Sequence, residues 1–537
     1  MSFALWTPLA IPALLAVLSL LVPSAVLRRL SPVASSVAVL VSGLLLISAV
    51  LADQVPTLGG GLLRADALSA YMLTVVGAVG LVSTWGGLGH ATEVPGRFAG
   101  SYDALISVFL AAMSLAVLAD NIGLMWAAVE ATTIATAFLV GHHRTPRSLE
   151  AAWKYVILGS VGVAIALLGI VLIYAASRGT GEATLSWLVL SQAGLPLDPA
   201  LIRAGGALAV LGFATKAGLA PMHSWLPDAH SQAPAPVSGL MSGVLLAVAL
   251  YAILRIQTIT DAVFGPDFLR IMLSVGGLLS LFVAAALLIR QRDFKRMLAY
   301  SSIEHMGMMA VGAAIGAAAL PAVLLYVLGH GLTKATLFVI SGRILEVEGT
   351  PKIDDVRALL VRRPGLAVPW LIAMAALIGF PPFSIFFSEV GIIVAGYTTG
   401  MGVVVGIALV LLLVIFASLT RLTVAMTIGA PTAVAAAAAA AAVTAAPVVP
   451  AAALTGLIPT VGAGASVTPA DVEPNRVVPV EPVVPVEPVV PVVPDRSAHG
   501  PMLPLILALG TTAVVPFIAE PVGTLLTRAA EVLGGIQ

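Results

Sequence analysis

The chain of 537 residues contains no cysteine, and only 10% of its residues are charged. The absence of cysteine excludes disulfides, iron–sulfur clusters and thiolate metal sites held by this chain alone. Basic and acidic residues balance at 26 each, so no net charge attracts nucleic acid. We therefore expect no cofactor, no metal site and no nucleic-acid partner.

Apolar residues are abundant instead. They make up 59% of the chain, and the mean hydropathy is +1.07. So little polar surface cannot cover a soluble globule. Several apolar runs exceed about 18 residues, which is enough to cross a hydrocarbon core of about 30 Å as a helix. The composition predicts an all-α polytopic protein embedded in a lipid bilayer.

The apolar runs predict about 14 transmembrane helices. The first, Met1–Val22, lacks a basic region and a small-residue cleavage site, so we expect a span rather than a cleaved signal. The tail Pro521–Gln537 fits a short amphipathic helix at the membrane interface. The predicted spans lie near residues 2–22, 32–52, 67–88, 101–119, 121–140, 149–176, 200–222, 234–256, 268–289, 296–315, 319–346, 366–397, 400–428 and 501–519.

Basic residues are distributed unevenly over the connections between these spans. Counted from the N-terminus, the odd connections hold most of them, for example Arg28, Arg144 and Arg290, whereas the even connections hold few, among them Arg255. The positive-inside rule then places the odd connections in the cytoplasm. We expect a multi-pass protein of the inner (plasma) membrane with both termini outside.

Two low-complexity segments interrupt the pattern. Ala433–Ala446 is nearly polyalanine, and Val477–Pro494 has proline at every third position from Pro479. A proline every third residue is typical of polyproline II, which buries no core. The second segment is either a cytoplasmic spacer or docking strip or, as we prefer, a tolerated insertion without a mechanism.

Ionisable residues occur inside several predicted spans. Each costs roughly 2.5–3.5 kcal/mol on insertion scales, so each is a functional candidate. An economical arrangement pairs Glu130 with Lys216 and lets the other groups face a hydrated interior. Structural salt bridges are the alternative, but so many groups over five spans favour ion conduction. The candidates are Glu130, Lys154, Lys216, Glu304, His305, His330, Lys334 and Glu389, and His223 and His230 are either proton carriers or structural hydrogen bonders.

Helix-breaking residues coincide with two of these charges. Gly218 and Pro221 follow Lys216, and Gly379 and the Pro381–Pro382 pair precede Glu389. Proline removes a backbone donor and frees a carbonyl, which a membrane tolerates only where protein or water satisfies the backbone. Paired interrupted helices are typical of the ion sites of inverted-repeat transporters.

Several long motifs together resemble a known family. They are KAGLAPMHSWLPDAHSQAPAPVSGLMSG, DFKRMLAYSSIEHMG, HGLTKATLF and GFPPFSIFFSE, with the span that contains Glu130 before them. They resemble the antiporter-like proton-pumping subunits of respiratory complex I, group 4 membrane-bound [NiFe] hydrogenases and Mrp antiporters. The resemblance covers roughly residues 100–425, and the SSIEHMG string is most similar to the hydrogenase-4 or formate hydrogenlyase branch.

The resemblance implies two inverted five-helix repeats, with helices 7 and 12 broken. The implied division is 1–100 for three N-terminal helices, 101–256 and 268–428 for the repeats, 429–500 for a low-complexity cytoplasmic linker, and 501–537 for a last helix and short tail.

The resemblance also assigns roles to individual residues. Glu130 matches the glutamate of the fifth span, Lys216 the pumping lysine of the broken seventh, and Lys334, beside His330, the lysine of the eleventh. Glu389 takes the twelfth-span position, and His305 is a central connecting group. The eighth span departs from the family, because it offers Ser238 and Ser242 where several members carry lysine or histidine. Water or Lys334 would have to bridge this gap.

Three functions remain open from the sequence. The preferred one is a proton-translocating subunit, not catalytic by itself, of an oxidoreductase complex of the NADH-quinone oxidoreductase or hydrogenase type. Its partners would be other membrane subunits and a peripheral redox arm. The second is a Na⁺ or K⁺/proton antiporter subunit of the Mrp type, and the third is a scaffold whose charges are structural.

Overall fold

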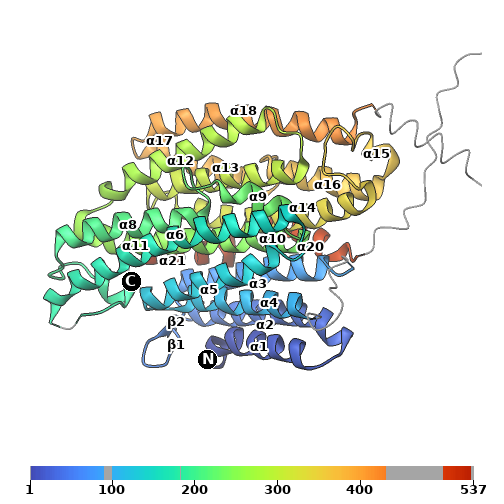
Figure 1. Cartoon of the computed structure of the whole chain (residues 1–537). Helices are drawn as coiled ribbons and strands as arrows, with labels where there is room; N and C mark the ends of the chain where they lie inside the picture. The colour runs from blue at the N-terminus through green and yellow to red at the C-terminus, as the bar shows by residue number, and fades with distance from the viewer. Residues whose placement is uncertain (1, 90–99, 182, 431–499, 534–537) are drawn as a thin grey trace, which may run out of the picture.

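The computed structural model describes residues 2–89, 100–181, 183–430 and 500–533. These residues form a bundle of long helices (Figure 1). Within these residues the single sheet is a small hairpin with two residues in each strand. In it, β1 (Thr57–Leu58) pairs antiparallel with β2 (Leu63–Arg64). The predicted all-α polytopic class is confirmed. The low-complexity segments Ala433–Ala446 and Val477–Pro494 lie outside the described residues.

Eleven described helices are long and apolar enough to cross a membrane. They match eleven of the predicted spans in order. They are α1 (Ser2–Leu21), α2 (Ala25–Leu51), α3 (Ala67–Gly86), α4 (Ser101–Leu118), α5 (Ile122–Val140), α6 (Pro146–Ala176), α8 (Pro199–Ala217), a continuous helix of α10 (Ala235–Leu240), a π-helical turn (Met241–Leu245) and α11 (Leu246–Phe264), α12 (Asp267–Leu288), α14 (Leu320–Glu348) and α18 (Gly402–Thr427).

Three further predicted spans correspond to less regular elements. The helix α13 (Phe294–Ile315) is long enough, but polar residues such as Glu304 and His305 lower its hydropathy. The predicted span 366–397 is two helices, α16 (Pro364–Leu377) and α17 (Ser384–Thr398). The last is α20 (Leu503–Val514) with the 3-10 turn Val515–Phe517. Shorter elements are the 3-10 turn Ser177–Thr180, α7 (Trp187–Leu190), α9 (Trp225–Gln232), α15 (Leu359–Arg362), the turn Ala519–Gly523 and α21 (Thr524–Leu533).

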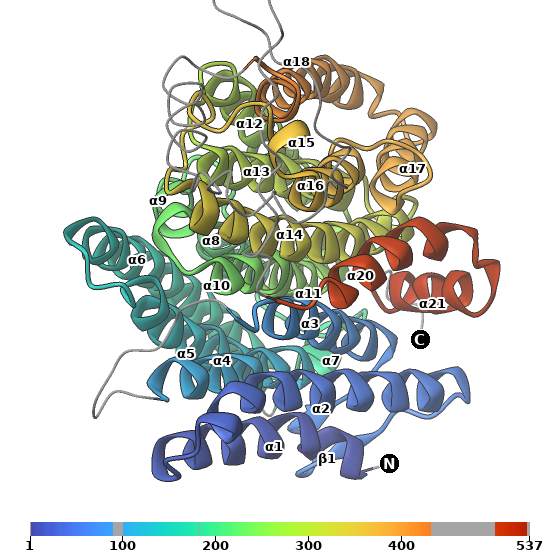
Figure 2. The same cartoon turned by 90° about the vertical axis from the view of Figure 1, so that its right-hand side faces the viewer.

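The α10–α11 helix is the centre of the bundle. Its membrane-spanning part is entirely buried, and the π-helical turn contacts both α3 and α14. Figure 2 shows α10 and α11 between α14 and α3. Peripheral helices expose large apolar side chains instead, as lipid contact requires. On α12, for example, Ile271 is 72% exposed and Phe282 58%. The bundle therefore encloses a core around α10–α11 that lipid does not reach.

The tail forms the predicted amphipathic helix, α21. Its apolar side is buried and contacts α3 and α14. Its polar side carries Arg528, which donates to the Val50 carbonyl at 2.7 Å and to Asp53 Oδ1 at 2.9 Å. The apolar face thus packs on the protein rather than in the lipid interface.

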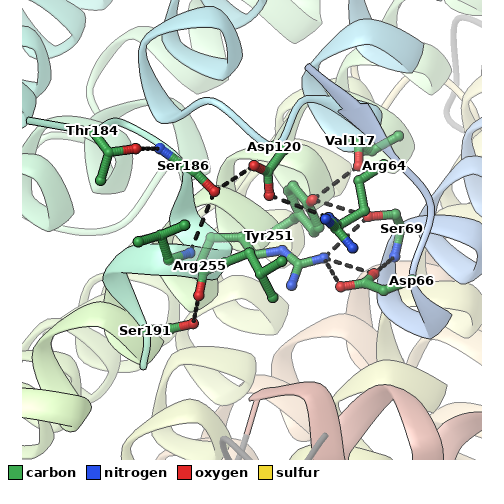
Figure 3. Close-up of polar contacts among 12 residues, drawn as sticks. Arg64, Asp66, Ser69, Val117, Asp120, Thr184, Ser186, Ser191, Tyr251 and Arg255 are labelled. Carbon is green, nitrogen blue, oxygen red and sulfur yellow. Dashed lines mark hydrogen bonds and ion pairs between the residues drawn. The ribbon is translucent and has the colours of Figure 1, made fainter. Parts of the chain in front are cut away.

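Arg255 does not lie in a connection, so that prediction is wrong. The α11 helix continues to Phe264, so Arg255 lies inside it and is fully buried. It is accommodated because Asp66, the N-cap of α3, accepts from its Nη2 at 2.7 and 2.8 Å (Figure 3). The guanidinium also lies 3.7 Å from the ring centroid of Trp187. Hydropathy does not predict a basic residue at this depth, because the acidic residue that compensates its charge is distant in the chain.

Arg255→Ala should strongly destabilise the fold. It would leave Asp66 as an uncompensated buried charge, and breaking a buried pair on one side costs about 3–5 kcal/mol. Unfolding in mixed detergent micelles measures this loss. The matched control is Arg270→Ala, which removes an ion pair to Asp267 whose acid is 81% exposed. That pair should contribute about 1 kcal/mol or less, and equal losses in the two variants would contradict the prediction.

Candidate functional site

The first break follows Lys216 directly. The helix α8 ends at Ala217, and Gly218 caps it in the left-handed conformation with φ 72°, which glycine adopts without steric cost. Lys216 lies in the last turn, where helix carbonyls favour a cation, and it is fully buried. Its Nζ donates to the Tyr155 hydroxyl of α6 at 3.3 Å. A short helix, α9, resumes at Trp225, so the predicted interruption of the seventh span is confirmed.

Glu130 does not form the predicted direct ion pair with Lys216. Its carboxylate accepts from Thr133 Oγ1 and from Ser160 Oγ, each at 3.1 Å. Lys216 is turned toward Tyr155, whose hydroxyl also contacts Thr136 Oγ1 at 2.7 Å. Hydroxyl groups of α5 and α6 therefore surround both charges. The half-buried Glu130 lies at the edge of this polar group, whereas Lys216 lies inside it.

Two further candidates lie apart from this buried group. Lys154 is partly exposed and bonds Glu150 Oε1 at 2.6 Å and Asp228 Oδ2 at 3.2 Å. Asp228, on α9, also accepts from Arg296 of α13 at 2.5 Å. His223 lies half-buried in the break. Lys154 is part of a charged network that joins α6, α9 and α13, and its predicted role in the relay stays a prediction.

His230 lies against α14, the helix that carries Lys334. It is fully buried on α9, with its ring stacked on Phe338 of α14 at 5.2 Å between centroids and 6.4 Å from Trp225. Neither ring nitrogen has a hydrogen-bond partner among the described residues. Phe338 is one helical turn beyond Lys334, so the imidazole stands beside the second lysine. Because its ring nitrogens have no such partner, His230 suits the role of a proton carrier better than that of a structural hydrogen bonder.

The second lysine belongs to a polar cluster of α13, α14 and the π-helical turn. Lys334 Nζ donates to the Leu298 carbonyl at 2.6 Å and to Ser301 Oγ at 2.5 Å. His330 Nε2 lies 3.3 Å from the Ser242 carbonyl. A π turn shifts the backbone pairing and so exposes a carbonyl to side chains. The eighth span thus contributes a backbone carbonyl at the place where several family members carry lysine or histidine.

A tyrosine connects this cluster to Glu389. The rings of His330 and His305 are 5.0 Å apart, and His305 Nδ1 lies 2.5 Å from the Tyr326 hydroxyl. That hydroxyl donates to Glu389 Oε1 at 2.9 Å. Glu389 is half-buried, whereas the two histidines and Tyr326 are fully buried. A continuous path of titratable side chains therefore runs from His330 to Glu389.

The second break shapes the end of this path. The helix α16 ends at Leu377 and α17 begins at Ser384, which confirms the predicted interruption of the twelfth span. Gly379 has φ 81°, and a Cβ at this position would lie 2.8 Å from Glu389 Oε2. Because only glycine combines that conformation with that clearance, the carboxylate packs directly against the broken backbone.

The same place could hold a cation. Ligand atoms of Glu304, His305 and Glu389 all lie within 4.8 Å of one another. Glu304 Oε2 lies 3.4 Å from His305 Nε2. Two carboxylates and an imidazole form a donor set that binds either protons or a small cation. The prediction of no metal ion stays a prediction.

Sequence reasoning missed the two tyrosines, although one signal was present. Tyr326, His330 and Lys334 are spaced by four residues, which places them on one face of a helix. Tyr155 follows Lys154 directly, and a rotation of about 100° between neighbouring helical residues turns it, rather than the lysine, toward Lys216. Tyr326 was recognisable from its spacing. The role of Tyr155 depended on how α6 is rotated in the bundle.

If this path carries protons, Tyr326→Phe should lower proton flux per assembled complex by about tenfold or more. The variant keeps the ring but removes the hydroxyl that joins His305 to Glu389, and a positioned proton donor contributes about 10²-fold or more. Tyr71→Phe is the matched control. Tyr71 is also buried and donates to α14, at the Leu324 carbonyl, but lies outside the path. Equal fluxes in the two variants would remove Tyr326 from the relay.

The chain is similar to known proteins in sequence and in fold. The hydrogenase-4 component F homolog of Methylacidiphilum infernorum is 42% identical over 308 residues, 56% of this chain and 64% of the relative. The match thus spans less than two thirds of that relative. A subunit of the archaeal membrane-bound sulfane sulfur reductase has a TM-score of 0.78 at 21% identity and covers both chains fully. A chain of the Mrp complex from Dietzia sp. DQ12-45-1b also reaches 0.78, at 21% identity, with 99% and 97% covered.

The two structural neighbours show the fold, and the hydrogenase-4 relative agrees with the branch that the SSIEHMG string indicated. Residues 119–416, more than half of the chain, match the family described as "NADH:quinone oxidoreductase/Mrp antiporter, TM". Both broken helices and all the titratable groups from Glu130 to Glu389 lie within that range. The chain belongs to the NADH:quinone oxidoreductase/Mrp antiporter family of membrane proteins.

Proposed function

We propose that the chain is a proton-translocating membrane subunit of a redox complex of the hydrogenase or NADH-quinone oxidoreductase type. The observation that carries this proposal is the line of buried titratable groups from Glu130 through Lys216, His230 and the α13–α14 cluster to Glu389. Its two ends are half-buried carboxylates and its interior is fully buried. Figure 2 shows their helices, α5 and α17, on opposite flanks of the bundle.

The contacts of Lys216 suit a switchable charge. The ammonium group has a hydroxyl partner but no direct carboxylate partner. The free energy of its charged form therefore depends on the distance to Glu130, and a movement of the α5–α6 hydroxyl groups changes that distance. Opening and closing this contact would bind and release a proton. Lys334 is held in the same way, by a carbonyl and a hydroxyl.

The energy for this movement would come from partner subunits. A cysteine-free chain holds no iron–sulfur cluster by itself. The hydrogenase-4 relative is named as a component of a larger assembly. We propose that this chain likewise joins other membrane subunits and a peripheral redox arm, without carrying the redox chemistry itself.

Purified complex reconstituted into liposomes tests the function. Redox turnover should acidify or alkalinise the lumen, and a protonophore should abolish the change. Redox turnover with no proton movement would contradict the proposal.

A Na⁺ or K⁺/proton antiporter is the second candidate. The cluster of Glu304, His305 and Glu389 favours it, since three ligand atoms within 4.8 Å suit a small cation. The same liposomes distinguish the two functions. Proton flux that requires Na⁺ or K⁺, and that is lost in Glu304→Gln, would favour the antiporter.

We also propose that residues 101–256 and 268–428 are the two repeats. Each range contains a long helix, a fully buried lysine and one broken helix, α8–α9 in the first and α16–α17 in the second. Residues 1–100 would form the N-terminal helices and 501–537 the last helix and tail. Residues 429–500 would be the linker between the second repeat and that last helix.

The orientation follows from the basic residues, with odd connections in the cytoplasm and both termini outside the plasma membrane. The cysteine-free sequence permits a direct test by single-cysteine labelling. An impermeant maleimide added to spheroplasts should label Gln192→Cys, an exposed position of an even connection. Arg147→Cys, exposed at the opposite end of α6, should react only after permeabilisation. The reverse pattern would invert the topology.

A further inference from the structure

A basic cavity lies at one end of the bundle, away from the proton path. Its volume is about 480 Å³, and it is bordered by the ends of α12 and α18 and by the segment that precedes α15. Four arginines and one aspartate line it: Arg290, Arg292, Arg357, Arg421 and Asp354. All of these residues belong to the side of the molecule that carries most of the basic residues.

The positive charge of this cavity is only partly balanced by protein. Arg357 pairs with Asp354 at 2.6 Å, and Arg421 donates to the Ile289 carbonyl, which is neutral. The exposed guanidinium groups of Arg290 and Arg292 have no partner among the described residues. The cavity therefore presents several unsatisfied donors to an anion.

The neighbouring helix faces indicate what kind of anion fits. On α12, Phe282 is 58% exposed and Leu287 43%, and on α18, Phe416 is 38% exposed and Val424 45%. All four side chains are exposed on helices whose ends border the cavity. A ligand that satisfies both regions has an anionic head and long apolar chains.

We propose that this cavity binds the phosphate headgroup of an anionic phospholipid, with the acyl chains lying along α12 and α18. Guanidinium groups bind phosphate through paired N–H donors, and basic pockets beside membrane helices select anionic lipids. The adjacent Asp293 caps α13, the helix that carries His305, by accepting from Arg296 N at 2.9 Å. A bound lipid would therefore brace the turn between α12 and α13. The proposal does not depend on the proton-translocating function.

Lipid titration of the purified assembly tests it. We would measure binding of phosphatidylglycerol and phosphatidylcholine by native mass spectrometry and by the thermal unfolding midpoint. Wild type should bind phosphatidylglycerol preferentially. The double variant Arg290→Gln/Arg292→Gln should weaken that binding about 30-fold. This is the effect of losing about 1 kcal/mol of electrostatic attraction per arginine. Arg147→Gln, which removes an exposed arginine on the same side, should leave it unchanged.

Further arms separate other occupants. Arg290→Lys/Arg292→Lys keeps the charge and should retain part of the binding, which distinguishes a binding defect from misfolding. An equal midpoint shift with phosphatidylcholine would overturn the proposal. So would an equal shift with inorganic phosphate, which would identify a free ion as the ligand. Lost subunit assembly with unchanged lipid binding in the glutamine variant would also overturn it, because the occupant would then be an acidic protein segment.

Discussion

Replacing Lys216 with alanine is expected to abolish proton translocation while leaving the subunit assembled. Moving one charge against about 200 mV costs roughly 4.6 kcal/mol, equivalent to about 3.4 pKa units. A site that lacks a switchable charge cannot supply this free energy, so flux should fall at least about 100-fold. The fold should survive, because Tyr155, the hydrogen-bond partner of Lys216, keeps its contact with Thr136. Alanine is also well tolerated in a membrane helix.

Two companion variants make this result specific. Glu130→Gln should behave similarly, because it removes the carboxylate whose approach modulates Lys216. Lys216→Arg keeps a permanent positive charge but cannot release its proton, so it should also block flux. If the charge of Lys216 were purely structural, arginine at this position would restore proton flux. Lys352→Ala, an exposed lysine, is the control, and normal pumping in either Lys216 variant would contradict the assignment.

Glu389→Gln is expected to slow proton flux at least about tenfold per assembled complex. Glutamine keeps the size of the side chain and can still accept from the Tyr326 hydroxyl, but it cannot carry a transferable proton. Glu389→Asp should retain part of the flux, because it keeps the carboxyl group at a shorter reach. The effect locates the exit of the relay at the second break.

The measurement must separate transport from assembly. If Glu389 only braces the backbone at Gly379, where its carboxylate packs closely, the glutamine variant would lower the amount of assembled complex instead. Proton flux normalised to assembled protein distinguishes the two roles. Unchanged normalised flux in Glu389→Gln would remove this residue from the path.

Much of the architecture was predictable because its causes are local. An apolar run long enough to span the bilayer must satisfy its own backbone, so it becomes a helix wherever it lies. Glycine and proline end helices through their own geometry, which explains why the breaks after Lys216 and before Glu389 were found in advance. The high cost of burying a charge likewise made Glu130, Lys216, Lys334 and Glu389 candidates for the proton path without a structure.

The contacts among those groups were not predictable, because they depend on how each helix is rotated and which helix packs against it. Lys154 and Tyr155 are neighbours in the chain, yet the tyrosine reaches Lys216 and the lysine joins a charged network with Asp228. Glu130 and Lys216 bond hydroxyl groups instead of forming the expected ion pair, because the packing of α5, α6 and α8 decides which side chains they reach.

Pairs far apart in the chain show the same limit. Arg255 was read as a residue of a connection because hydropathy treats a charge as a helix end, whereas Asp66 of α3 compensates it inside the bundle. Composition and periodicity were sufficient for the membrane class, the order of the spans, the two breaks and the identity of most titratable groups. Side-chain partners, the tyrosine link to Glu389 and the arginine-lined cavity arose from tertiary packing, since short-range polar contacts require positions that no local pattern specifies.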